Sequence, residues 1–104
     1  MTRAPRLILL LLAMGYALPG AGDAKEKYET LCSACHGFGV AGAPRLGIKD
    51  DWTPRLSGGR EVLYRNAIDG FTGKTGIMPP KGGFTELSEE QVREIVDYMV
   101  ESIQ

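Results

Sequence analysis

Cysteine, histidine and tryptophan are scarce in this chain of 104 residues, which has two, one and one of them. A structural zinc site takes four ligands. The two cysteines and one histidine of this chain are too few to complete such a site. The formal net charge of −1 excludes the strongly basic surface of a nucleic-acid-binding protein. The longest apolar run, residues 7–14, is shorter than the roughly 20 residues that span a bilayer. No strand pattern, repeat or low-complexity tract is present, which favours a single small helical domain.

The N-terminal segment has the pattern of a secretory signal peptide. Two arginines precede the apolar run, and small residues follow it as far as Ala24. We therefore predict that residues 1–24 are a signal peptide cleaved near Ala24 and that the protein is exported to the periplasm. Cleavage after Gly22 and retention as an amphipathic anchor are the alternatives.

Residues 25–104 remain as a single domain whose core is small enough to need additional stabilisation. Its charges are unevenly distributed. Residues 25–81 contain nine lysines and arginines against six acidic residues, whereas residues 82–104 contain one arginine against six acidic residues. This asymmetry either steers the encounter with a charged partner or reflects only a solvated helix face.

Hydrophobic periodicity predicts an all-α domain of three to four helices with long loops. A first helix is expected from Asp23, which forms a capping box with Glu26. A middle helix is expected over about 59–69, ended by a glycine, with a short helical turn before it over 50–55. The last helix is the clearest, with a capping box over 88–91. Its apolar stripe comprises Val92, Ile95, Val96, Met99 and Ile103.

The sequence Cys32-Ser33-Ala34-Cys35-His36 is the attachment signature of c-type haem. Two cysteines one helical turn apart can bond both vinyl groups of one porphyrin, and the adjacent His36 then lies under the ring as an iron ligand. A thioredoxin-like redox pair would need a βαβ context. A plain disulfide over this spacing would close only a small, poorly stabilising loop.

Met78 is the expected second iron ligand. It is followed by Pro79 and Pro80, which hold the backbone extended and so can aim one thioether at a metal. Thioether ligation suits ferrous iron and raises the reduction potential. Met99 instead fits the core stripe of the last helix.

Taken together, these motifs resemble a class I cytochrome c, and within that family the small bacterial c-five group. The resemblance covers the whole of residues 25–104. It implies that the carbonyl of Pro44 accepts a hydrogen bond from the proximal imidazole, and that Trp52 and Arg55 contact the haem propionates. It also implies that the first and last helices cross near Tyr98. Many c-five proteins have a further cysteine pair after the Met loop, which this chain lacks, so Phe84 and Leu87 should take over that packing.

The resemblance implies a non-enzymatic one-electron carrier with one covalent haem c. It would be a monomer that docks transiently with redox donors and acceptors and meets membranes only through partner complexes. Lys74 and Lys81 either rim the docking surface or are simply solvated. Three alternatives remain: a haem enzyme or gas sensor with an open iron position, a thiol–disulfide oxidoreductase, and a fixed subunit of a larger redox complex.

Overall fold

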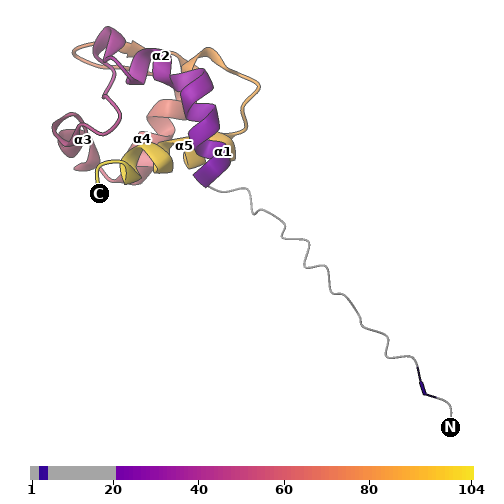
Figure 1. Cartoon of the computed structure of the whole chain (residues 1–104). Coiled ribbons are helices and arrows are strands. Elements are labelled where there is room, and N and C mark those ends of the chain that lie inside the picture. Colours follow the sequence, from indigo (N-terminus) through magenta and orange to yellow (C-terminus); the bar gives the residue numbers. More distant parts are fainter. Residues whose placement is uncertain (1–2, 5–20) are drawn as a thin grey trace.

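The computed structural model describes residues 3–4 and 21–104, and within them the chain folds mainly into helices (Figure 1). The predicted all-α class is confirmed, with one small exception, a two-stranded antiparallel hairpin. The helices are α1 (Ala21–Lys27), α2 (Ser33–His36), α3 (Lys49–Leu56), α4 (Arg60–Asp69) and α5 (Glu89–Glu101), and the strands are β1 (Phe71–Thr72) and β2 (Ile77–Met78).

The predicted signal peptide falls mostly outside the described residues. Its last part is described, and there Ala24 is buried within α1 while Gly22 is exposed. Within the described part of the chain, no helix has the length and apolar character needed to cross a membrane.

The N-terminal helical segment begins earlier than predicted. Helix α1 starts at Ala21, so Asp23 lies in its first turn instead of capping it, and the predicted capping box with Glu26 is wrong. A π-helical turn over Tyr28–Cys32 then joins α1 to α2. The hydroxyls of Thr30 and Ser33 donate hydrogen bonds to the carbonyls four residues earlier, an arrangement that bends helices.

Helices α4 and α5 follow the sequence prediction closely. Helix α5 begins with the predicted capping box, in which Ser88 and Gln91 exchange side-chain-to-backbone hydrogen bonds. Gly59 and Gly70 flank α4 with positive φ angles of 88° and 86°. The buried residues of α4 are Leu63, Ala67 and Ile68, whereas Val62 is exposed.

The core lies where α1 and α5 pack side by side, with α4 against α5 (Figure 1). The rings of Tyr28 and Tyr98 meet there with centroids 5.5 Å apart, which confirms the expected crossing of the first and last helices. Leu87 is buried and Phe84 packs against the same cluster, as expected for a chain without the additional cysteine pair. This helical body holds both the cysteine motif and the hairpin in place.

Candidate haem site

The two cysteines lie at the end of the N-terminal helical segment. Cys32 is the last residue of the π-helical turn and is half-buried, whereas Cys35 lies in α2 and is exposed. Both are free thiols. The helical path from Cys32 to Cys35 therefore presents two sulfurs one turn apart, with His36 immediately after them.

Burial makes Cys32 a poor redox thiol. Desolvation, and secondarily the nearby Cys35, raises the pKa of Cys32 to about 11. A thiol with this pKa is almost fully protonated at neutral pH, whereas the reactive cysteine of a thiol–disulfide oxidoreductase has a lowered pKa. Cys32 therefore lacks the lowered pKa that the oxidoreductase interpretation would require of it.

His36 is held by one hydrogen bond to the loop that follows it. Its Nδ1 lies 2.8 Å from the carbonyl oxygen of Pro44, the contact that the family resemblance implied. A carbonyl can only accept, so Nδ1 carries the proton and Nε2 has the free lone pair. Burial lowers the pKa of His36, while the bond to Pro44 acts in the opposite direction and the charge of Arg55 lowers it further. The result is a neutral, oriented imidazole, the form that binds metals.

Trp52 supports the same loop from α3. It is buried, and its ring stacks near that of His36 at a centroid distance of 6.4 Å and an interplanar angle of 23°. Its indole N–H donates to the carbonyl of Arg45 at 2.8 Å. The only donor of the indole is thus used within the protein in this arrangement, and a contact with a haem propionate stays a prediction.

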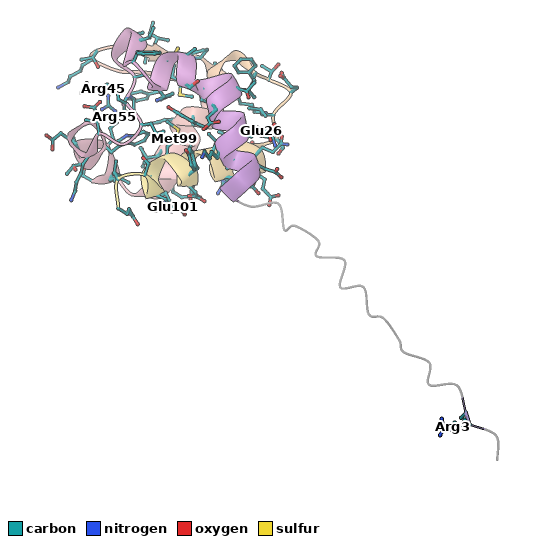
Figure 2. All side chains as sticks on the ribbon, viewed as in Figure 1. Arg3, Glu26, Arg45, Arg55, Met99 and Glu101 are labelled. Atoms are coloured by element: carbon teal, nitrogen blue, oxygen red, sulfur yellow. The ribbon has the colours of Figure 1, made fainter. Side chains whose placement is uncertain are left out.

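Arg55, the second residue expected at the haem propionates, is exposed on α3. Its guanidinium donates to the carbonyl of Asp51 at 2.6 Å and to the carbonyl of Gly42 at 3.3 Å. Arg55 therefore joins α3 to the loop after His36, and its contact with a propionate also stays a prediction. Figure 2 shows Arg55 on α3 and Arg45 on the same side of the molecule.

Met78 approaches the site from the hairpin. It is half-buried at the end of β2, paired with Phe71 and followed by the two prolines. Gly70 allows this close approach, because an added Cβ would lie 3.1 Å from the Met78 carbonyl oxygen and 3.0 Å from Pro80. Met99, by contrast, is buried in α5 as predicted. Met78 packs against the core cluster but is only partly buried, so it is the more accessible of the two methionines.

The loop after His36 and the turn before Met78 touch each other. A Cβ added to Gly76 would lie 1.4 Å from the carbonyl oxygen of Ala41, and one added to Gly42 would lie 2.5 Å from that of Thr75. No residue with a side chain fits at Gly76 without moving one of the two loops. The histidine side and the methionine side of the site are therefore held together by backbone contact.

Several large apolar side chains around these loops are exposed to solvent. Phe38 and Ile77 are 85% and 68% exposed, and Val40 and Phe71 are about half exposed. Clustered exposed apolar side chains mark ligand or partner sites. Together with two free thiols, a neutral imidazole and a thioether, they match the chemistry of a large apolar ring that binds iron. The residues present fit a haem.

One feature of the site was missed by sequence reasoning. Asp51, in α3, accepts hydrogen bonds from the backbone N–H and the guanidinium of Arg45, the residue after Pro44. The two residues are six positions apart across a loop, and no periodic pattern relates them. The acidic residue before Trp52 was the only available signal.

Known proteins with similar sequences and structures are cytochromes. A family model described as cytochrome c oxidase, cbb3-type, subunit III matches residues 20–99. Cytochrome c-555 of Chlorobaculum thiosulfatiphilum is 41% identical over 80 residues, which are 77% of this chain and 93% of the relative. Cytochrome c5 of Ectopseudomonas mendocina is 37% identical over 82 residues, 77% of this chain and 90% of the relative.

Two solved structures have the same fold. One is from an electron-transfer complex of nitrite reductase with cytochrome c, and its matching chain is 36% identical with a TM-score of 0.67, covering 78% of this chain and 94% of that one. The other, a mono-haem ferrocytochrome c from Shewanella putrefaciens, is 34% identical with a TM-score of 0.60 and covers 73% and 89%. The expected resemblance is confirmed. The chain belongs to the class I cytochromes c, small electron carriers with one covalently attached haem c.

Proposed function

We propose that this cytochrome carries one electron at an iron held by Nε2 of His36 and the sulfur of Met78, in a haem bonded to Cys32 and Cys35. The observation that carries the proposal is the hydrogen bond from His36 to Pro44, which leaves Nε2 as the only free ligand atom of the ring. Met78 supports it as the more accessible of the two methionines.

When bound, the haem supplies an iron that gains and loses a single electron. The protein's own residues orient the iron ligands and keep other ligands and water from the iron. Pro44 fixes the plane of the imidazole and increases its basicity. Met78 would supply the second iron ligand, and its thioether would keep external ligands from the iron and the iron low-spin. The apolar side chains beside the site limit the access of water.

Redox proteins are the partners of such a carrier, and we propose that this chain meets them as a monomer through brief contacts at the exposed apolar residues. Phe38 and Ile77 offer such a surface beside the site. Small interfaces that come apart quickly suit electron transfer. Lys74 is exposed and available at the rim, whereas the ammonium group of Lys81 donates to the carbonyl of Leu87 at 2.5 Å and is less available.

We further propose export to the periplasm with cleavage of residues 1–24 near Ala24. The charged and apolar pattern of the N-terminus supports export. Ala24 is buried in α1, so cleavage after it must precede folding, while cleavage after the exposed Gly22 would leave this packing intact. The mass of the mature protein distinguishes the two sites.

The attachment and the proximal ligand are tested on protein made in a host that matures c-type haem. We expect the haem to stay with the wild-type chain under denaturing conditions and to be released when both Cys32 and Cys35 are replaced by alanine. His36→Ala should abolish the low-spin spectrum. An unchanged low-spin spectrum in His36→Ala would show that another residue is the proximal ligand.

A further inference from the structure

The peptide bond between Pro44 and Arg45 is hydrogen-bonded at both ends. Its carbonyl oxygen accepts from Nδ1 of His36 at 2.8 Å, and its N–H donates to Oδ2 of Asp51 at 3.0 Å. The peptide is trans, so the two groups point in opposite directions. One peptide unit therefore lies between the carboxylate and the imidazole.

An anion on the N–H of a peptide changes its carbonyl. Resonance links the two ends, which is why the C–N bond has partial double-bond character. A negative charge at the N–H favours the form with more charge on oxygen, and hydrogen bonds in such chains strengthen one another by about 10–30% each. The carbonyl of Pro44 thereby becomes a better acceptor for the proton on His36.

The surrounding contacts keep this geometry in place. The carbonyl of Arg45 accepts from Trp52, and the N–H of Leu46 donates to the carbonyl of His36 at 2.9 Å. The guanidinium of Arg45 binds both oxygens of Asp51, at 2.8 and 3.1 Å. The hydrogen bond and charge of Arg45 lower the pKa of Asp51 to about 2, so the carboxylate is ionised throughout the neutral range.

We infer that Asp51 is a positioning residue that acts through the Pro44–Arg45 peptide to make the imidazole of His36 more electron-rich, and so lowers the reduction potential of the iron. The inference rests on the ligation by His36 proposed above. A stronger hydrogen bond on Nδ1 gives Nε2 more negative character, which stabilises ferric over ferrous iron.

The test compares reduction potentials of the haem-loaded wild type, Asp51→Asn and Asp51→Ala. Asparagine still accepts a hydrogen bond but has no charge, and charged bonds are about twice as strong as neutral ones. We therefore expect the potential to rise in the order wild type, Asp51→Asn, Asp51→Ala. Applying the strengthening above to a charged hydrogen bond gives a shift of about 1.3- to fivefold toward ferrous protein, or roughly 7–40 mV at about 59 mV per tenfold change.

The matched control is Asp50→Asn. Asp50 is the exposed neighbour of Asp51 and takes no part in the contacts with Arg45. It should leave the potential near the wild-type value. A shift as large as that of Asp51→Asn would show that any lost charge on α3 suffices and would overturn the inference.

Two other causes could shift the reduction potential of Asp51→Asn: a loosened loop and the loss of a charge. The variant Arg45→Gln and the double variant distinguish them from the proposed role of Asp51. Arg45→Gln keeps the backbone N–H of this residue but removes the cation that partly neutralises Asp51, so it should lower the potential. If loosening were the cause, Asp51→Asn and Arg45→Gln would shift the potential in the same direction.

The double variant, with both Asp51→Asn and Arg45→Gln, has the net charge of the wild type. We expect the rise caused by Asp51→Asn to persist in it at high salt, where exposed charges are screened. Its loss there would overturn the inference.

The chemical shift of the Nδ1 proton of His36 is a measurement that a change in stability alone would not alter. In reduced, diamagnetic protein the Nδ1 proton of His36 should resonate at lower frequency and exchange faster with water in Asp51→Ala than in the wild type. If Asp51→Ala is low-spin and neither this proton nor the potential changes, the role of Asp51 is overturned but the ligation by His36 is not. Absence of low-spin haem from the wild type would overturn the ligation by His36 as well.

Discussion

At the scale of the residue, the two methionines of the folded domain have opposite environments. Met99 is buried in α5 among the core side chains, whereas Met78 lies half-buried at the end of β2. Burial alone would make Met99 a packing residue and leave Met78 available to a ligand. The difference can be tested by truncating each side chain in turn.

Met78→Ala should open an iron position while leaving the fold intact. We expect a change from low to high spin and a lower reduction potential, because the thioether that favours ferrous iron is lost. Met99→Ala should keep the wild-type spectrum but lower the free energy of unfolding by about 2–5 kcal/mol, as for other large-to-small core substitutions. Visible spectra and denaturant titrations of both variants check this, and exchanged phenotypes would show that the methionines had been assigned the wrong way round.

Local spacing was enough to predict the core position of Met99, which the structure confirms. The haem roles of the cysteines and His36 come from the same kind of short motif and stay predictions. The bond between Asp51 and Arg45 could not be foreseen, because it depends on how the loop of residues 37–48 turns back on α3. The hydrogen bonds from the guanidinium of Arg55 to two backbone carbonyls could not be foreseen for the same reason.

At the scale of the element, helices with complete local signals were predicted best. Helix α5 has a capping box and a continuous apolar stripe, and the structure has both. The N-terminal helix was less well predicted, since its start precedes Asp23 and its π-helical turn over Tyr28–Cys32 has no periodic signature. The hairpin of β1 and β2 was missed because two-residue strands are too short to show alternation.

The capping box of α5 makes a measurable contribution to stability. Ser88→Ala removes the oxygen that accepts from the N–H of Gln91, so the free energy of unfolding should fall by about 0.5–2 kcal/mol. Denaturant titration measures the change. Thr85→Ala, an exposed residue just before the helix, is the control and should have little effect; equal losses in the two variants would contradict a specific cap.

The contact between the two loops predicts an effect of Gly76→Ala on the iron. The added Cβ would lie 1.4 Å from the carbonyl oxygen of Ala41, so the turn before Met78 must move away. We expect a less stable protein in which part of the iron has lost the methionine and become high-spin. Gly58→Ala is the matched control, because its Cβ would make only ordinary contact with Val62. A fully low-spin Gly76→Ala protein would show that Met78 does not depend on this contact.

At the scale of the whole molecule, two features of the sequence can be compared with the structure: the uneven distribution of charge and the small size of the core. Ion pairs join α4 to α5. Two of them, Arg60–Asp97 and Arg65–Glu89, use two of the six acidic residues near the C-terminus, and Arg93 pairs in turn with Glu61 of α4. The charge asymmetry of the sequence is therefore partly neutralised within the fold. The mostly helical architecture was predictable because every long apolar stripe had helical spacing.

The small core predicts that the folded domain depends on its haem. A domain of this size has little apolar surface of its own to bury, so the apolar faces of the haem would add substantially to the core. Protein made without haem attachment should therefore show less helical circular dichroism and a lower melting temperature than the mature form. Equal melting temperatures for the two forms would contradict a stabilising role for the haem.

The central claim, that His36 and Met78 both bind the iron, is tested most directly by adding carbon monoxide to the reduced wild-type protein while recording its visible spectrum. We predict low-spin spectra in both redox states and no response to the gas, because both axial positions are filled. A high-spin spectrum that shifts when carbon monoxide is added would contradict the account. It would show an open iron position, which suits a haem enzyme or gas sensor better than an electron carrier.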